Sequence, residues 1–397
     1  MPVSEQTPRG PAEPLAGRRI LLVVNKDWYF LSHRLPLAVS LRDAGAQVTI
    51  AAGATGRETE IMRHGFQFRP LTFDRGGINP FRELRTIADL YRVIRIEKPE
   101  IVHNIAIKAT LYGSIAARLA GVKAIVNTVT GLGFLFTATT GFGAALRWLV
   151  SPFFRLACRS KKVHFIFFND DDRETFFQLG FTTEAASTVI PGSGVEIESF
   201  PPADPSREPP TIVMCARLLL DKGLRELVAA TRLLRSEGLT FRVIVAGERD
   251  SSNPHVVDAQ ELAGWIAEGL IEAPGFIKDT RALLSSASIA ALPSYREGMP
   301  LFLLEALAAG LPIVTTDVPG CRATVEPGVN GERVPARNAI ALAAALRSLI
   351  TDPTRRAQLG ASSRRIARER FAQDIVNAQT LRVYENSCLR GSLAQRA

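Results

Sequence analysis

Short apolar runs rich in β-branched residues alternate with longer segments of helical spacing along most of the chain. Near the amino end, ILLVV (20–24) precedes HRLPLAVSLRDAG (33–45), whose apolar residues recur at helical spacing and which ends in a glycine. Strands joined by crossover helices form parallel sheets, so the pattern predicts an α/β protein with doubly wound sheets. The expected strands are 20–24, 48–53, 101–106, 124–129, 164–169 and 187–192 in the first half, and 211–217, 241–247, 271–276, 289–294 and 312–317 in the second.

The alternation is interrupted near residue 200. FPPADPSREPP (200–210) holds five prolines, which exclude a helix or a central strand. This segment predicts a linker between two Rossmann-like domains, 18–199 and 211–366. A final helical segment, 367–397, is long enough to pack back on the first domain. The Pro-rich, polar residues 1–17 are expected to form a disordered tail without the apolar core of a signal peptide.

Composition narrows the class of protein. The chain has 397 residues, of which 46% are hydrophobic and 22% charged, as in folded soluble proteins. A net charge of +9 favours an anionic partner, such as nucleotide phosphates, nucleic acid or an anionic membrane. The four cysteines form no CxxC pair, which indicates reduced thiols without zinc or disulfides. No run reaches the roughly 18 apolar residues of a membrane span, so we expect a cytoplasmic protein, either free or peripheral on the inner face of the cytoplasmic membrane.

Residues 131–162 depart from the alternation. They are rich in Phe, Leu and Trp and end in a basic cluster. Two interpretations stay open: a buried pair of helices, or an apolar lip with a cationic rim, which would suit a bilayer interface or a lipid-linked substrate. The cations of that rim are Arg147, Arg155, Arg159, Lys161 and Lys162.

Two glutamates stand in PSYREGMPLFLLEALAAGLPIVTTD (293–317). Gly298 and Pro300 separate them, and proline is favoured at the first position of a helix. Glu297 is therefore expected on the loop that leaves a strand, and Glu305 on the second turn of the next helix, roughly 7.5 Å from its start. A ligand could span both carboxylates with its phosphates at the helix N-terminus. Because carboxylates only accept hydrogen bonds, sugar hydroxyls are their natural partners.

Cations accompany two neighbouring strand ends. In CARLLLDKGLREL, Arg217 follows a strand and Lys222 precedes a helix, so both reach the same rim of the second domain. Arginine grips a diphosphate with a planar fork and lysine adds a compact charge. In AGERD, Gly247 permits close backbone approach and Arg249 offers a third cation.

These residues resemble a known family. Arg217 with Lys222, followed by Glu297 and Glu305 at E-x7-E spacing, is similar to glycosyltransferase family 4, retaining enzymes of the GT-B fold in which two Rossmann-like domains face a cleft. The resemblance extends over nearly the whole chain. It implies that the two cations hold the donor diphosphate, Glu305 the ribose, and Glu297 with the backbone after it the transferred sugar. The donor-binding set is Arg217, Lys222, Gly247, Arg249, Glu297, Gly298, Met299, Pro300, Leu301 and Glu305.

Further motifs resemble one branch of that family. NKDWYFLSHR, KATLYGS, TGLGFLFT and GERD are most similar to bacterial members that extend undecaprenyl-diphosphate-linked glycans, often with N-acetylated hexosamines from UDP-sugars. This implies a UDP-sugar donor, a polyprenyl-diphosphate-linked acceptor and a role in cell-surface polysaccharide synthesis, such as lipopolysaccharide or exopolysaccharide. Lys108, Gly131 and Gly133 are the acceptor-side candidates.

The loop at 25–29 departs from the family pattern, because NKDWY stands where many members have Gly-Gly, so contacts there cannot be transferred. His103 is the candidate for a catalytic histidine, with His33 and His164 as alternatives. The catalytic set is then Arg217, Lys222, Glu297 and His103. No Asp-rich metal motif accompanies the cations, so no metal or other cofactor is expected.

Three other functions are alternatives to this one. A nicotinamide-dependent oxidoreductase needs a G-x-G-x-x-G turn, and the nearest approach, TGFGAAL (140–146), lacks the last glycine and a preceding strand. A nucleic-acid partner is not expected, since the basic residues are spread among acidic ones. A nucleotide-sugar epimerase of the same architecture would use the same donor site without an acceptor and stays open as the alternative.

Overall fold

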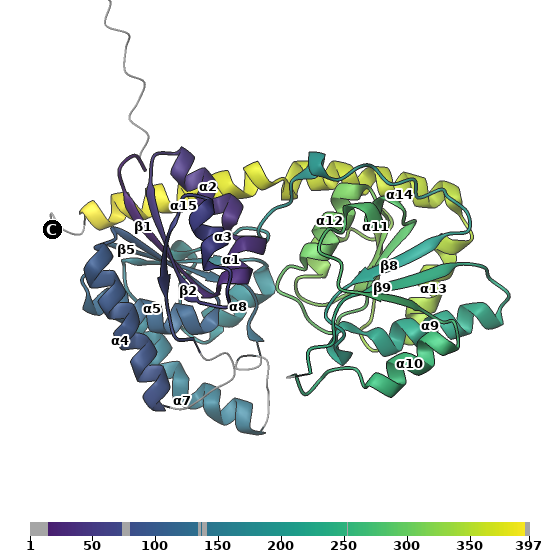
Figure 1. Ribbon diagram of the computed structural model, residues 1–397, viewed down its shortest axis with the longest axis horizontal. Helices are drawn as coiled ribbons and strands as arrows, with labels where there is room; N and C mark the ends of the chain where they lie inside the picture. The colour runs from purple at the N-terminus through teal and green to yellow at the C-terminus, as the bar shows by residue number, and fades with distance from the viewer. Residues whose placement is uncertain (1–14, 74–79, 134–135, 137–140, 252, 394–397) are drawn as a thin grey trace, which may run out of the picture. The chain divides into compact units, whose positions relative to one another are not determined.

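The computed structural model describes residues 15–73, 80–133, 136, 141–251 and 253–393. The chain divides into two compact units (Figure 1). The first comprises Met1–Phe167, Arg173–Val189 and Asn377–Ala397, and the second comprises Phe168–Asp172 and Ile190–Val376. Each unit holds one parallel sheet, which confirms the predicted doubly wound α/β class.

The first unit is built on a seven-stranded sheet of order β3-β2-β1-β4-β5-β6-β7. Strand order reverses between β1 and β4. The crossover helices α4, α5 and α7 pack side by side, α5 between the other two, on one face of the sheet (Figure 1). The strands are β1 (Arg19–Lys26), β2 (Gln47–Gly53), β3 (Gln67–Pro70), β4 (Ile101–Ile105), β5 (Ala124–Val129), β6 (Val163–Phe167) and β7 (Ser187–Val189). The helices are α1 (Asp27–His33), α2 (Leu35–Asp43), α3 (Glu58–Arg63), α4 (Pro80–Glu97), α5 (Ile107–Leu119) and α7 (Gly141–Cys158), together with the part of α8 (Asp170–Gln178) from Arg173 onward.

The second unit holds a six-stranded sheet of order β10-β9-β8-β11-β12-β13, and here the reversal falls between β8 and β11. Helix α13 packs beside α9, while α12 contacts α11 and α14. The strands are β8 (Thr211–Cys215), β9 (Arg242–Ala246), β10 (Glu272–Gly275), β11 (Ile289–Leu292), β12 (Ile313–Thr316) and β13 (Gly331–Val334). The helices are α9 (Leu224–Ser236), α10 (Ala259–Ala267), α11 (Arg281–Ser285), α12 (Leu301–Ala309), α13 (Ala339–Ile350) and α14 (Pro353–Ile366).

Sequence patterning located every strand of the two sheets except β3 and β13, which are two of the four edge strands. β3 (QFRP) and β13 (GERV) are four residues each and carry charged or proline residues, so neither shows a continuous apolar run. The helix expected at 33–45 corresponds to α2, and it is preceded by a short helix that the sequence did not predict, α1, which ends at His33. Pro36 lies in the first turn of α2 and carries no N–H, so it favours a new helix start there.

The Pro-rich segment 200–210 is not a free linker. The chain passes into the second unit at Ile190, before this segment. The buried guanidinium of Arg356 in α14 donates to the carbonyl oxygen of Pro205 (2.6 Å) and pairs with the carboxylate of Glu208 (2.5 Å). Buried polar groups need such partners, so these bonds fix the segment against its own unit.

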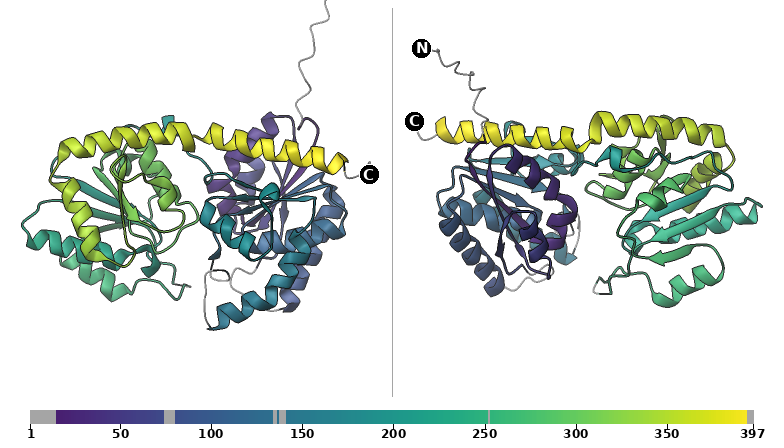
Figure 2. Two further views of the ribbon diagram at one scale, coloured as in Figure 1. Left: turned by 180° about the vertical axis from the view of Figure 1, so that it is seen from behind. Right: turned by 45° about the horizontal axis from the view of Figure 1, so that its top comes forward.

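The C-terminal segment changes unit along its length. A π-helical turn, Ala367–Phe371, is followed by Ala372 and then by α15 (Gln373–Leu393). From Asn377 onward the chain belongs to the first unit, along which α15 runs (Figure 2). Asn377 Nδ2 donates to Ser40 Oγ at 2.9 Å, and Tyr384 is fully buried.

The expected tail at 1–17 lies outside the described residues up to residue 14, and Leu15 is buried. In the part of the chain that the structure describes, no helix has both the length and the apolar character to cross a bilayer.

Candidate functional site

The strongest group of polar side chains lies where the strand order of the second sheet reverses. Open α/β sheets bind ligands at the carboxyl ends of their strands, at such a switch point. The loop after β8 carries Arg217 and Lys222, and the loop after the neighbouring strand β11 carries Glu297. Residues 75 positions apart in sequence thereby meet at one sheet edge.

Lys222 and Glu297 form an enclosed ion pair. Lys222 Nζ lies 2.6 Å from Glu297 Oε1, and the two side chains are only 13% and 15% exposed. Ser294 Oγ donates to the same oxygen at 2.8 Å. Both bonds fall on Oε1, so the carboxylate is held from one side. An ammonium has three donors, and one of them is used here, which leaves capacity for anionic ligand oxygens.

The loops that carry this pair are fixed by glycines. Gly223, directly after Lys222, has a φ of +76°, and a Cβ on it would lie 2.1 Å from the carbonyl oxygen of Pro293. Gly320 approaches the Glu297 loop equally closely: its Cβ would lie 2.5 Å from the carbonyl oxygen of Glu297. Only glycine permits these contacts, so the backbone around the ion pair has little freedom.

Glu305 occupies the fifth position of α12, on the turn predicted from the sequence. Pro300 is the residue before the helix rather than its first residue, a shift of one position from the expectation. Burial raises the pKa of the Glu305 carboxyl to about 7, against a hydrogen bond that Thr280 Oγ1 donates to its Oε2 at 2.9 Å. The same carboxylate adds to the effect of burial on Cys215, whose pKa is raised to about 12. Glu305 therefore lies near Cys215, the last residue of β8.

Arg217 is the solvent-exposed cation of the site. Its guanidinium contacts Asp250 at 3.4 Å and its side chain remains 49% exposed. The Arg249 side chain instead turns to the protein, since its Nε donates to the carbonyl oxygen of Val257 at 2.9 Å. At Gly247 a Cβ would lie 1.8 Å from the carbonyl oxygen of Ala216, so this glycine is required by packing of the backbone itself.

Residues outside the predicted donor-binding and catalytic sets hold the loop before α12. Asn169 Nδ2 donates to the carbonyl oxygen of Gly298 at 2.8 Å. Arg296 lies 2.5 Å from the fully buried carboxylate of Asp172. Burial raises the pKa of Asp172, and Arg296 opposes that rise. FND at 168–170 ends a predicted strand, but nothing in its spacing indicated which loop it would contact.

The remaining donor-side candidates follow Glu297 directly. Met299 is partly buried and packs against Gly192, where a Cβ would lie 2.7 Å from Met299 Cγ. Pro300 is buried and Leu301, the first residue of α12, is partly buried. These residues therefore shape the approach to the α12 N-terminus, where backbone N–H groups have no helical partner.

The first unit has a corresponding small pocket at its own switch point. It lies at the carboxyl ends of β1 and β4 and measures about 100 Å³. Ala106, before α5, adopts a φ of +83°, which is costly for a residue with a Cβ. The pocket is lined by Asn25, Lys26, Trp28, Tyr29, Ile105, Ala106 and Thr130. The departure from the family pattern at 25–29 therefore falls on this pocket.

Of the acceptor-side candidates, Gly131 directly follows Thr130 of this pocket and has a φ of +137°. Gly133 also has positive φ, at +59°, with open space around its Cβ position. The Lys108 ammonium lies 2.8 Å from the Glu83 carboxylate, so its charge is already paired within the unit.

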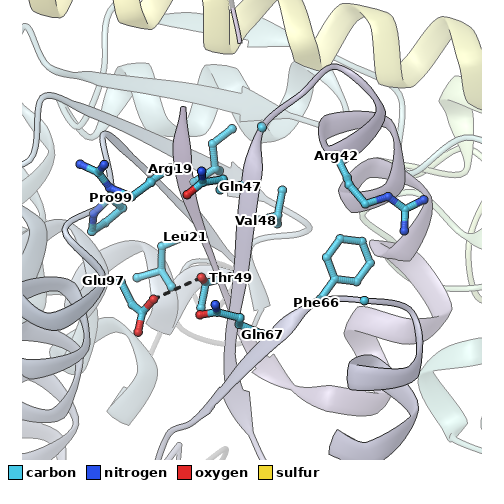
Figure 3. A pocket seen from close by; sticks show the side chains of 13 residues that line it. Arg19, Leu21, Arg42, Gln47, Val48, Thr49, Phe66, Gln67, Glu97 and Pro99 are labelled. Atoms are coloured by element: carbon cyan, nitrogen blue, oxygen red, sulfur yellow. Dashed lines mark hydrogen bonds between the residues drawn. The ribbon is translucent and has the colours of Figure 1, made fainter. Parts of the chain in front are cut away.

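A second hollow in this unit lies at the opposite sheet edge (Figure 3). It is lined by residues at the amino ends of β1, β2 and β3, among them Arg19, Gln47 and Gln67. Since ligands of such sheets bind at the carboxyl ends of the strands, we do not include this hollow in the candidate functional site.

His103, the candidate catalytic histidine, is fully buried in β4. Its Nδ1 lies 2.5 Å from the Tyr384 hydroxyl of α15 and its Nε2 lies 2.6 Å from Thr128 Oγ1. Burial holds its pKa well below the usual value. With both ring nitrogens engaged inside the unit, His103 cannot reach a substrate, and we correct its assignment to a residue that ties α15 to the sheet.

Replacing His103 by phenylalanine is therefore expected to lower the free energy of unfolding by about 1–3 kcal/mol, because Tyr384 and Thr128 lose their partner. The turnover number should change less than threefold at temperatures where the variant is folded. Urea unfolding followed by circular dichroism measures the first quantity. A variant with unchanged stability and no turnover would restore the catalytic assignment.

The two alternative histidines differ in their placement. His33 ends α1, stacks on the ring of Tyr29 at 4.4 Å, and so lies next to the small pocket. Burial lowers its pKa to about 4. His164 in β6 has its Nε2 at 2.9 Å from Thr188 Oγ1 of β7, within the sheet.

Two parallel Rossmann-like sheets, with clustered cations and two carboxylates at the switch point of the second, define a glycosyltransferase of the GT-B class. Comparison with known proteins agrees. The model of "Glycosyl transferase 4-like" proteins matches residues 19–168. The model of "Glycosyl transferases group 1" matches residues 209–352. The chain belongs to this family of glycosyltransferases and is an enzyme.

Relatives of known name are also glycosyltransferases. The chain is 26% identical over 378 residues to the N,N'-diacetylbacillosaminyl-diphospho-undecaprenol alpha-1,3-N-acetylgalactosaminyltransferase of Campylobacter jejuni, with 90% of this chain and 97% of that protein covered. It is 27% identical to an Escherichia coli UDP-Gal:alpha-D-GlcNAc-diphosphoundecaprenol alpha-1,3-galactosyltransferase, over 64% of this chain and 67% of that protein. Both names are those of transferases, and the epimerase alternative finds no support.

Solved structures share the fold. A glycosyltransferase from Rickettsia africae superposes with a TM-score of 0.76 at 16% identity, covering 94% of this chain and 98% of that one. Anabaena HepE in complex with UDP superposes with a TM-score of 0.74 at 18% identity, covering 93% and 100%.

Proposed function

We propose that the protein transfers a hexose or N-acetylhexosamine from a UDP-sugar to a polyprenyl-diphosphate-linked glycan, with retention of anomeric configuration, during synthesis of a cell-surface polysaccharide. The observation that carries the proposal is the enclosed Lys222–Glu297 pair at the switch point between β8 and β11. The printed names of the Campylobacter jejuni and Escherichia coli relatives support the lipid-linked acceptor, and the second of them supports a UDP-sugar donor.

The donor would be held by charge and by sugar hydroxyls. Lys222 and Arg217 receive the diphosphate, together with the N–H groups at the start of α12. Glu305 accepts from the ribose hydroxyls through Oε1, since Thr280 donates to Oε2. Glu297 accepts from the transferred sugar through Oε2, since Ser294 and Lys222 occupy Oε1.

The reaction breaks the bond between the anomeric carbon and the diphosphate oxygen and forms a bond to the acceptor hydroxyl oxygen. Negative charge grows on the leaving diphosphate, and preorganised cations stabilise that charge. We propose that the acceptor's proton passes to the leaving diphosphate oxygen, so no side-chain base is needed. We also propose that the reaction needs no metal, because the two cations supply the positive charge, and activity should be unchanged by EDTA.

We further place the protein in the cytoplasm, at the inner face of the cytoplasmic membrane. The lipid-linked acceptors in the relatives' names support this location. All four cysteines lie in the described part of the chain and none forms a disulfide, which fits a reducing compartment.

Release of UDP tests the proposal. The protein is incubated with UDP-GlcNAc, UDP-GalNAc, UDP-Glc or UDP-Gal, with and without a polyprenyl-diphosphate-linked sugar. Release that requires the acceptor is expected from one donor above the others. Equal release without acceptor would mean donor hydrolysis, and release from none of the four would contradict the donor class.

The raised pKa of Glu305 predicts a pH-dependent donor affinity. With a pKa of about 7 in the free protein, this carboxyl gains a proton as the pH falls from 8 to 6, and a protonated carboxyl is a poorer acceptor for ribose hydroxyls. The Kd of an intact UDP-sugar, whose diphosphate does not titrate near pH 7, should rise below pH 7 by up to about tenfold per pH unit. Titration calorimetry measures it, and Glu305→Gln should show no such slope.

A further inference from the structure

Helix α7 presents an apolar face to solvent. Trp148 is 80% exposed, Leu149 58%, Phe153 55% and Leu156 72%. Their spacing places all four on one side of an α-helix. Leu119 at the end of α5, 69% exposed, lies nearby, since its neighbour Arg118 donates to the carbonyl oxygen of Leu156. We call these five residues the α7 patch.

The α7 patch is not needed for the fold. The opposite side of α7 already packs into the unit through Phe154, Ala157 and Cys158, all buried. Phe154 stacks on Phe181 at 5.2 Å and meets Phe176 edge-on. Exposed large side chains gathered on one helix face therefore mark a surface for binding rather than unfinished packing.

The stretch of chain that carries the α7 patch has charge of one sign. Residues 101–169 contain no aspartate or glutamate, and they include eight lysines and arginines. Five of these follow or flank the apolar face: Arg147, Arg155, Arg159, Lys161 and Lys162. Among the residues that the structure describes, none of the five forms an ion pair, and Arg155 contacts only a carbonyl oxygen, that of Leu179. Their charges are thus available to an external anionic surface.

We propose that the α7 patch and its five cations dock the protein on an anionic lipid bilayer, with α7 lying in the plane of the interface. A helix with Trp, Phe and Leu on one face and cations around it has the composition of interfacial helices. Tryptophan favours the boundary between headgroups and acyl chains. A protein partner would offer apolar surface as well, but would not explain 69 residues without a single acidic side chain.

The docking surface is independent of the donor site, which lies in the second unit. It is compatible with a lipid-linked acceptor but does not require one. Vesicles that contain no acceptor lipid therefore test it without involving the reaction.

Co-sedimentation with vesicles of phosphatidylcholine alone, or with 30% phosphatidylglycerol, is the test. We expect the protein to bind the phosphatidylglycerol vesicles at least tenfold more tightly than the phosphatidylcholine vesicles. Raising NaCl from 50 to 500 mM should abolish that preference. The triple variant Trp148→Ser, Leu149→Ser, Phe153→Ser should lose at least tenfold in partition coefficient. Ile340→Ser, which removes a side chain 76% exposed in the second unit, is the matched control.

A charge-reversal variant and a measurement of self-association complete the test. The variant Arg159→Glu, Lys161→Glu, Lys162→Glu should lose the preference for phosphatidylglycerol. Binding that survives both triple variants, or wild-type protein that ignores phosphatidylglycerol vesicles, would overturn the inference. A third outcome would also overturn it: the wild type dimerises in analytical ultracentrifugation and binds no vesicles, and the serine variant is monomeric.

Activity on a short-chain, water-soluble acceptor separates this inference from the proposed function. The serine variant should keep wild-type kcat on that acceptor while losing vesicle binding. A protein that binds vesicles but transfers no sugar would retain the docking surface and refute the proposed function, and the reverse result would refute the docking surface alone.

Discussion

Lys222→Ala is expected to lower kcat by about 100- to 1,000-fold, the loss seen when one preorganised group is removed from a developing negative charge. Lys222 is the enclosed cation of the site, and Arg217 cannot replace it because the Arg217 guanidinium is half exposed and contacts Asp250. Steady-state UDP release with saturating donor and acceptor measures the loss. Lys123→Ala, which removes an exposed lysine from the first unit, should leave kcat unchanged.

A folding defect could imitate this result. Removing Lys222 leaves the Glu297 carboxylate, 15% exposed, without its ion pair, at a cost of about 1–3 kcal/mol. Turnover is therefore measured at a temperature where circular dichroism shows Lys222→Ala to be folded, and the loss of kcat should persist there. If the folded variant turned over at the wild-type rate, Lys222 would be a structural residue and the account of the leaving group would be wrong.

Glu305→Ala is expected to raise the Kd of the UDP-sugar by about 10- to 100-fold, the value of a hydrogen bond to a charged group. The ribose lies away from the reacting carbon, so the interaction is made equally in the ground and transition states, and kcat should change little. Thermal stability should not fall, because burial already disfavours this carboxylate.

Glu268→Ala is the control for that variant, since Glu268 is a 51% exposed carboxylate paired with Arg232 on the same unit. Its Kd for the donor should equal that of the wild type. A large loss of kcat in Glu305→Ala at unchanged Kd would show that this carboxylate acts on the reacting centre and not on the ribose.

The buried parts of the fold were predictable from sequence because their signal is local. Central strands such as β5 (AIVNTV) are buried along their whole length, so hydrophobicity alone located them. The edge strands β3 and β13 carry no such signal. The prediction that 200–210 is a linker was also wrong. Its prolines indicate irregular backbone, but they say nothing about its hydrogen bond to Arg356, about 150 residues later in the sequence.

The placement of Arg217, Lys222 and Glu297 was predictable because each lies on a loop that follows a strand, and parallel strands bring their carboxyl ends to one edge. Contacts between residues that are far apart in the sequence could not be predicted. The sequence around His103 does not indicate that Tyr384 of α15 covers its ring. In the same way, the sequence around Asp172 does not indicate its ion pair with Arg296. Thr280, which donates to Glu305, lies in a loop whose spacing indicates nothing about its partner.

The most direct test of the central claim is the mass of the acceptor after incubation with the preferred UDP-sugar. We predict that a polyprenyl-diphosphate-linked sugar gains the mass of one hexose or N-acetylhexosamine, with one UDP released for each sugar transferred, and that Lys222→Ala abolishes the gain. An acceptor of unchanged mass beside released UDP, or an equal gain with Lys222→Ala, would contradict the account.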